Sequence, residues 1–155
     1  IEHLVADGAV CGRQALALLD SDGFGGPRFV MGRSLGANPA LEVAARVPGY
    51  DGLILESGAG NVARFASRLG VPTDAEFDRL VAAHEAKLAI ITVPCLIIHG
   101  MSDDLVPVDN AVMTASMLTG SEVTTEFVEN AGHNDLLWVA RDRYFAAIAH
   151  LIGTS

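Results

Sequence analysis

A serine between two glycines is the residue of this sequence with the clearest chemical potential. Ser34 lies at the centre of Gly32-Arg33-Ser34-Leu35-Gly36, after a short apolar run and before a segment of helical composition. A strand, a tight turn and a helix around Gly-x-Ser-x-Gly is the setting of a nucleophile elbow. There the serine takes a strained backbone conformation, and we expect Gly32 and Gly36 to lack side chains so that strand and helix can approach. The pattern predicts a nucleophilic hydroxyl.

Two further segments offer the partners that such a hydroxyl requires. A serine is a weak nucleophile at neutral pH and needs a base in hydrogen-bond reach, itself oriented by a carboxylate. Asp103 and Asp104 follow a predicted strand at 95–99, and His133 follows a predicted strand at 122–128. The order along the chain is therefore serine, aspartate, histidine.

The loops that carry these residues resemble those of a known superfamily. The His-Gly-x-x-Asp-x-x-Val-Pro segment that begins at His99, and the Gly-His-Asn-Asp segment that begins at Gly132, are similar to the acid and histidine loops of α/β-hydrolases, particularly serine esterase-like and peptidase-like members. The similarity spans almost the entire chain. It implies Ser34 as nucleophile, Asp103 as orienting acid and His133 as general base of a serine hydrolase. We expect small carboxylic esters as substrates, cleaved through an acyl-enzyme.

Several alternatives stay open at this point. Asp104 competes with Asp103 for the role of the acid, and so does Glu56, because in some superfamily members the acid lies on that earlier strand. His99 is expected to be structural, and Arg33 and Asn134 to be scaffolding beside the site. A peptidase or a thioesterase would use the same three groups, and a catalytically silent half-domain is the alternative from another class.

The resemblance also shows what the sequence lacks. An oxyanion needs two backbone N–H donors as a rule, and Leu35 would supply one. In the superfamily the second comes from a loop after an early strand, and nothing before residue 28 resembles that strand. We therefore expect only the C-terminal part of the fold, with the strand at 28–32 as an open apolar edge. Such an edge invites pairing, either with a missing N-terminal segment or with a second copy in a homodimer.

The elements that must position these groups alternate between helix and strand. Apolar periodicity and turn residues predict strands at 28–32, 52–56, 95–99 and 122–128, and helices at 2–19, 35–47, 61–69, 74–90, 109–118 and 135–152. Crossovers that contain helices imply an α/β fold with a mostly parallel sheet and helices on both faces. We expect one domain over 1–155, a partial one because the early strands are missing, with a small cap-like excursion at 58–92. Phe65, Leu69 and Phe77 of this excursion would line an acyl pocket or the core.

Composition bounds the partners of the protein. The 155 residues are 50% apolar and carry a formal net charge of −9 with only ten Lys and Arg, which disfavours nucleic acid. The apolar stretch at 88–98 is too short for a membrane helix, and with no visible signal peptide we expect a cytoplasmic protein. Cys11 and Cys95 are expected to be reduced core thiols, and we expect neither a metal nor a cofactor.

Overall fold

The computed structural model describes residues 2–58, 63, 66, 70 and 74–154. Its centre is one sheet of four parallel strands in the order β1-β2-β3-β4, in agreement with the prediction. The strands are β1 (Phe29–Arg33), β2 (Gly52–Glu56), β3 (Cys95–Gly100) and β4 (Val123–Val128). Because all four strands run the same way, their carboxyl ends meet at one end of the sheet.

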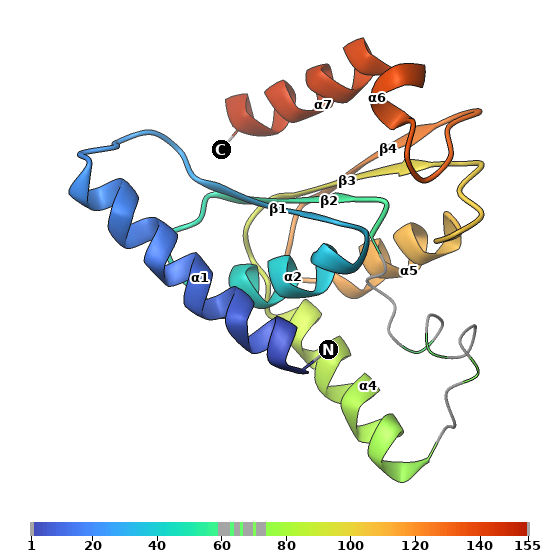
Figure 1. The fold of residues 1–155 in the computed structure, drawn as a ribbon, viewed down its shortest axis with the longest axis horizontal. Coiled ribbons are helices and arrows are strands. Elements are labelled where there is room, and N and C mark those ends of the chain that lie inside the picture. The colour runs from blue at the N-terminus through green and yellow to red at the C-terminus, as the bar shows by residue number, and fades with distance from the viewer. Residues whose placement is uncertain (1, 59–62, 64–65, 67–69, 71–73, 155) are drawn as a thin grey trace.

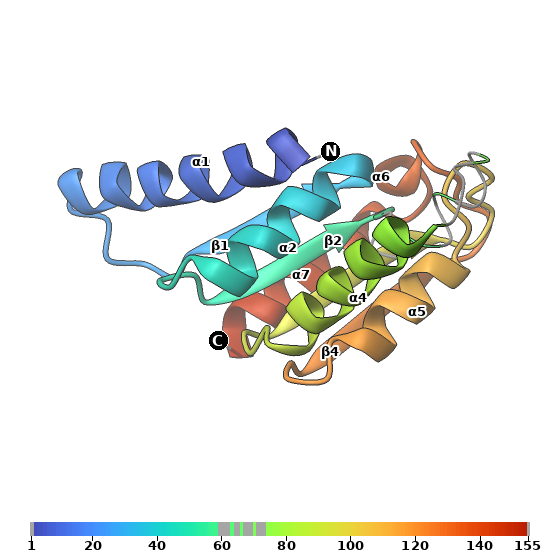
Figure 2. The same cartoon turned by 90° about the horizontal axis from the view of Figure 1, so that it is seen from below.

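Helices cover both faces of this sheet (Figures 1 and 2). Among the described residues, α1, α2, α4 and α5 lie on one side of the sheet and α6 and α7 on the other. Their bounds are α1 (Glu2–Ser21), α2 (Ala37–Arg46), α4 (Ala75–Ala89), α5 (Asp109–Met117), α6 (Leu136–Val139) and α7 (Arg141–Thr154), and the short 3₁₀ turn η1 (Ser34–Gly36) leads into α2. The prediction of an α/β architecture is confirmed.

Two predicted elements differ from the structure or lie outside it. The helix expected at 135–152 is two helices, because the backbone leaves the helical region at Ala140, with φ −142° and ψ 45°. The helix expected at 61–69 lies almost entirely outside the described residues, as do Phe65 and Leu69. Later in the expected excursion, the Asp74 carboxylate caps α4 by accepting hydrogen bonds from the N–H groups of Glu76 and Phe77.

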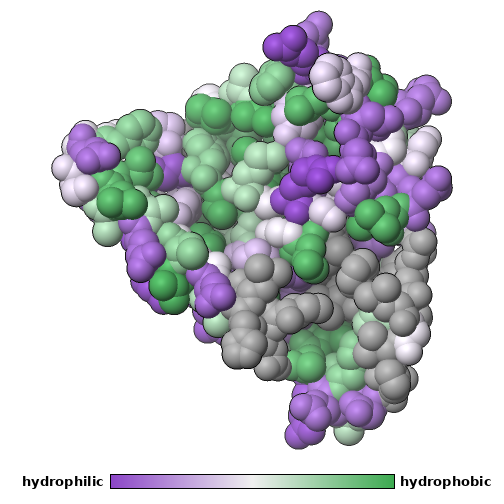
Figure 3. Space-filling view, viewed as in Figure 1, coloured by the Kyte–Doolittle hydropathy of each residue, from purple (hydrophilic) through white to green (hydrophobic). Residues whose placement is uncertain are grey.

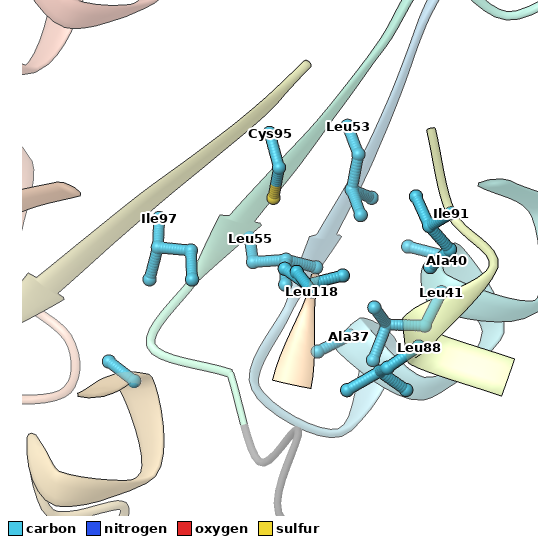
Figure 4. Packing of buried hydrophobic residues seen from close by; sticks show 11 residues of the cluster. Ala37, Ala40, Leu41, Leu53, Leu55, Leu88, Ile91, Cys95, Ile97 and Leu118 are labelled. Carbon is cyan, nitrogen blue, oxygen red and sulfur yellow. The ribbon is translucent and has the colours of Figure 1, made fainter. Parts of the chain in front are cut away.

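The core is divided by the two central strands, whose side chains alternate between the faces. Leu53 and Leu55 of β2, with Cys95 and Ile97 of β3, point toward Leu41 and Leu88 of the helices on one side (Figure 4). Ile54, Leu96 and Ile98 point the other way, against α7. Every residue of β2 and β3 is buried, which explains why the sequence shows apolar runs without alternation.

Helix α1 approaches α2 closely at two glycines. A β-carbon at Gly8 would lie 2.6 Å from the Pro39 side chain, and one at Gly12 would lie 3.0 Å from Val43. Gly12 also accepts a hydrogen bond from the Tyr50 hydroxyl through its carbonyl oxygen. These contacts explain why the glycines do not end the helix. No described helix combines the length and apolar character that a membrane crossing requires.

Strand β1 forms one edge of the sheet, as expected. Beside it lies a hollow of about 400 Å³ between α1, β1 and α2. Figure 3, which has the same orientation as Figure 1, shows mostly apolar surface over β1 between α1 and α7. Met31 of β1 is 46% exposed and lines the hollow.

The two cysteines differ in their surroundings, and both are free thiols. Cys95 is buried in the sheet, and burial raises its pKa to about 12. Cys11 lies on the exposed side of α1 and borders the hollow. The prediction of two core thiols is therefore right for Cys95 and wrong for Cys11.

Candidate active site

The turn after β1 has the strained geometry of a nucleophile elbow. Ser34 has φ 53°, in the left-handed region that side chains other than glycine rarely adopt. It ends the strand and opens the η1–α2 helical segment, so its hydroxyl lies at the carboxyl end of the sheet. A β-carbon at Gly32 would overlap the Gly36 carbonyl oxygen and Ala40. Glycine at position 32 is thus a steric requirement of the turn.

The second flanking glycine behaves differently from the expectation. A β-carbon at Gly36 would meet no atom within 4 Å among the described residues, and its φ of −63° is ordinary for any residue. Gly36 instead lines the hollow beside β1. The prediction that Gly36 must lack a side chain for packing is wrong, because a β-carbon at this position would point into open space although its carbonyl oxygen lies close to Gly32.

The structure brings Ser34, His133 and Asp103 into one chain of hydrogen bonds. His133 Nε2 lies 3.0 Å from Ser34 Oγ, and His133 Nδ1 lies 2.7 Å from Asp103 Oδ2. A carboxylate only accepts hydrogen bonds, so Nδ1 carries the proton and Nε2 is left as an acceptor for the serine hydroxyl. This arrangement allows an imidazole to take the proton of a serine that attacks an electrophile.

Asp103 is the carboxylate that contacts the histidine. Its side chain is fully buried, and its Oδ1 accepts hydrogen bonds from the N–H groups of Leu105 at 3.0 Å and Val106 at 2.7 Å. These bonds fix the carboxylate so that Oδ2 faces His133. Asp104 is exposed on the same loop, and the two oxygens of Glu56 are bonded to Arg33 and Tyr144.

His99 is buried behind the aspartate, as a structural residue would be. Its Nε2 lies 2.7 Å from the carbonyl oxygen of Val106 and 3.5 Å from Asp103 Oδ2. Because a carbonyl accepts, Nε2 carries a proton. Burial is the main cause that lowers the pKa of His99, with the Val106 hydrogen bond and the Asp103 charge acting in the opposite direction. His99 therefore supports the loop that holds Asp103.

Comparison with known proteins finds solved structures that resemble this chain in fold. The sequence matches no protein-family model and no curated protein. A puromycin-hydrolyzing peptidase of Mycobacterium tuberculosis aligns with a TM-score of 0.71 at 18% identity, over 90% of this chain and 24% of that one. An α/β hydrolase from a sediment metagenome of the Mar Chica lagoon, Morocco, aligns with a TM-score of 0.65 at 16% identity, over 95% of this chain and 70% of that one. A monoacylglycerol lipase of Paleococcus ferrophilus aligns with a TM-score of 0.61 at 15% identity, over 93% of this chain and 76% of that one.

This chain has an α/β-hydrolase fold. It spans 70%, 23% and 66% of the lengths of the first three solved structures that it resembles, so it carries only part of some of those chains. The α/β-hydrolase segment that it does carry includes the elbow and both loops at the carboxyl ends of β3 and β4.

The resemblance predicts the Leu35 backbone N–H as an oxyanion donor. Leu35 is the second residue of the helical segment that begins at Ser34, and the first N–H groups of a helix have no acceptor within it. The Leu35 N–H therefore has no acceptor within the helix, and its role as an oxyanion donor stays a prediction. Within residues 2–58 the element before β1 is helix α1 and not a strand, so the loop that would supply a second donor is not among the described residues.

Sequence reasoning missed two features of the site. A β-carbon at Gly100 would overlap the carbonyl oxygen of Ala131, so this glycine lets the His133 loop close over the end of β3. Arg33 and Asn134, predicted as scaffolding, contact each other across the site, and the Arg33 guanidinium also bonds Glu56. The signal available in the sequence was an arginine directly before the serine, with a glutamate at the end of the next strand.

Proposed function

We propose that this protein is a serine hydrolase that cleaves small carboxylic esters through an acyl-enzyme. The observation that carries the proposal is the hydrogen-bonded chain from buried Asp103 through His133 to Ser34, with the serine on a strained elbow. The α/β-hydrolase fold supports it, because the fold places these groups at the carboxyl ends of parallel strands. No cofactor takes part in the proposed reaction.

In the first half of the reaction Ser34 attacks the ester carbonyl carbon. His133 Nε2 takes the hydroxyl proton as the new C–O bond forms, and Asp103 stabilises the imidazolium through Nδ1–H. The Leu35 N–H donates to the oxyanion of the tetrahedral intermediate. The intermediate then expels the alcohol, which receives the proton from His133, and Ser34 keeps the acyl group.

In the second half water replaces the alcohol. His133 removes a proton from the water as it attacks the acyl carbon, and returns this proton to Ser34 Oγ when the acid leaves. The buried carboxylate of Asp103 keeps the same ring nitrogen protonated throughout. One ester and one water therefore give one acid and one alcohol, with the enzyme unchanged.

Fluorophosphonate labelling, read by intact mass, tests the nucleophile. We expect stoichiometric labelling of the native chain, and a loss of at least about 1,000-fold in labelling rate for Ser34→Ala and His133→Ala, since the three groups act as one unit. Ser102→Ala is the matched control, because Ser102 is an exposed hydroxyl residue of the neighbouring acid loop. Labelling that survives Ser34→Ala, or its absence from a folded native chain, would contradict the proposal.

A substrate comparison tests the reaction subclass. The assay compares acetyl and butyryl esters of p-nitrophenol with a matched thioester and an aminoacyl p-nitroanilide. These substrates differ in the leaving atom, which is oxygen, sulfur or nitrogen respectively. We expect kcat/KM to be highest for the esters. A preference for the anilide or the thioester would assign the protein to the peptidase or thioesterase alternative instead.

A second candidate is a domain that acts only after another strand pairs with β1. It is favoured by the open edge of β1 and by the apolar hollow beside it, which an added strand could cover. The strand would come from a second copy or from a segment that precedes residue 1. Sedimentation of the wild-type chain and of Met31→Lys tests the second copy. This candidate predicts a dimer that Met31→Lys dissociates, and a monomer at all concentrations would count against it.

A further inference from the structure

Arg33, the residue directly before Ser34, joins the elbow to the histidine loop. Its Nη2 donates hydrogen bonds to the backbone oxygen of His133 at 2.6 Å and to Asn134 Oδ1 at 2.7 Å. His133 and Asn134 lie 100 and 101 positions after Arg33 in the sequence. One guanidinium thus spans two loops that meet only in the folded chain.

The Arg33 guanidinium is itself held by buried residues of the neighbouring strand β2 and of helix α7. Arg33 Nε donates to Glu56 Oε1 at 2.9 Å, and Glu56 lies opposite Arg33 in the register of β1 and β2. The second oxygen of Glu56 accepts a hydrogen bond from the Tyr144 hydroxyl at 2.6 Å. Glu56 and Tyr144 are both buried. The anchor therefore extends from the sheet to α7, although the Arg33 side chain is 43% exposed.

The histidine loop has a matching tie on its other side. The Ser102 N–H donates to the carbonyl oxygen of Ala131, which joins the histidine loop to the acid loop. That bond joins the loop of His133 to the loop of Asp103, and the Arg33 bonds join it to the strand that leads to Ser34. A base must lie within hydrogen-bond reach of the proton that it takes, and a displacement of 1 Å can cost about 100-fold in rate.

We propose that Arg33 is a positioning residue for the reaction of Ser34: its guanidinium fixes the distance between the His133 imidazole and the serine hydroxyl, and Glu56 and Tyr144 fix the guanidinium. The role rests on the proposed serine-hydrolase function. Among the described residues, the guanidinium donates hydrogen bonds to Glu56, to the His133 carbonyl and to Asn134, so it links the elbow to the histidine loop.

The first test compares the fluorophosphonate labelling rates of Arg33→Gln and of Glu56→Gln with that of the wild type. Glutamine cannot reach both Glu56 and the His133 carbonyl, so we expect labelling and kcat to fall about 10- to 100-fold in Arg33→Gln, with KM for p-nitrophenyl acetate within about twofold of the wild type. Arg46→Gln is the control, since Arg46 is an exposed arginine of α2 that pairs with Glu42. Labelling of Arg33→Gln at the wild-type rate, or a change confined to KM, overturns the proposal.

The double variant separates positioning from general loss of stability. If Glu56 acts through Arg33, the variant with both substitutions should label no more slowly than Arg33→Gln alone, because the two residues serve one contact. If the fold-losses in labelling rate of Arg33→Gln and Glu56→Gln multiply in the double variant, the two residues act independently and the link between them is overturned. Melting temperatures of all variants show whether each chain is folded at the assay temperature.

A nuclear magnetic resonance measurement keeps the inference distinct from the proposed function. The Nδ1 proton of His133 is hydrogen-bonded to Asp103 and can be followed in ¹⁵N-histidine protein without any substrate. We expect its exchange with water to be at least about 10-fold faster in Arg33→Gln than in the wild type or in Arg46→Gln. If the wild type is not labelled by the fluorophosphonate, the hydrolase proposal fails, and the exchange rate alone tests the positioning role of Arg33. An unchanged rate in Arg33→Gln overturns that role, and so does the absence of the Nδ1 proton signal in the wild type.

Discussion

Strand β1 meets two different environments, one at its end and one along its side. At its end, Arg33 and Ser34 take part in hydrogen bonds to β2 and to the His133 loop. Along its outer side β1 has no neighbouring strand among the described residues, and Met31 lines an apolar hollow. The strand therefore leads into a hydrogen-bonded turn at its end while its outer side is exposed.

The hydrogen-bonded arrangement of Ser34, His133 and Asp103 therefore forms without a strand that covers the outer side of β1. The groups that hold Ser34, Asp103 and His133 together come from the ends of β1, β2, β3 and β4 and from α7, all of which the chain contains. What an additional strand would change is the exposed apolar surface and the backbone groups of β1. Assembly of the site and closure of the sheet are separate problems in this fold.

The largest expected effect contrasts two residues that lie opposite each other. Ile54 is buried in β2 and pairs in register with Met31 of β1. We expect Ile54→Ala to lower the free energy of unfolding by about 3 kcal/mol, because it leaves a cavity in the core, and Met31→Ala by less than about 1 kcal/mol. Urea unfolding measures both. Equal losses would mean that the side of β1 is covered in solution.

The two glycines of the elbow give the next contrast. A methyl group at Gly32 would overlap backbone and side-chain atoms of the following helix, whereas one at Gly36 would enter open space. We expect Gly32→Ala to cost about 2–3 kcal/mol and Gly36→Ala to be nearly neutral. Thermal unfolding of the pair decides the matter, and a large loss at position 36 would show that the space there is filled.

Removal of the Tyr144 hydroxyl tests how tightly the end of β1 is tied. Burial first, and then the hydrogen bond to Glu56, raise the pKa of Tyr144, so the phenol stays protonated and donates at any working pH. Tyr144→Phe leaves Glu56 Oε2 without this donor and should cost about 1–2 kcal/mol. Phe145→Tyr, a change at an exposed aromatic neighbour, serves as the control in the same unfolding assay.

The smallest expected effect concerns pH and the buried histidine. Folding lowers the pKa of His99. The stability linked to this shift is complete above the ordinary histidine pKa of about 6.5. It is lost as the pH falls below that value, because the unfolded chain takes up a proton that the folded chain does not. Between pH 7.5 and 5 the wild type should lose up to about 1 kcal/mol more than His99→Gln does. Parallel pH profiles of the two chains would contradict a neutral His99.

Much of the fold could be predicted because its signals are local. The runs of β2 and β3 are apolar at every position that the sheet buries, and the Gly-x-Ser-x-Gly turn follows directly from a strand. The three groups of the triad come together because each lies just after a strand and parallel strands end together. The predicted elements therefore agree with the observed strands to within one residue at each end.

The remaining features depend on contacts between distant parts of the chain. Whether Gly32 or Gly36 needs to be glycine is decided by where α2 passes, and whether Cys11 is buried is decided by which side of α1 faces α2. The Arg33, Glu56 and Tyr144 cluster joins residues from β1, β2 and α7. No periodicity within one element carries that information.

The unequal burial of the two cysteines makes the hollow beside β1 accessible to spectroscopy. Burial keeps the thiol of Cys95 protonated at neutral pH, and only a thiolate reacts readily with an alkylating dye. Cys11 is exposed and borders the hollow. A maleimide fluorophore added to the native, unmodified chain would therefore mark a single position, and its emission would report directly on any strand or second molecule that comes to lie along β1.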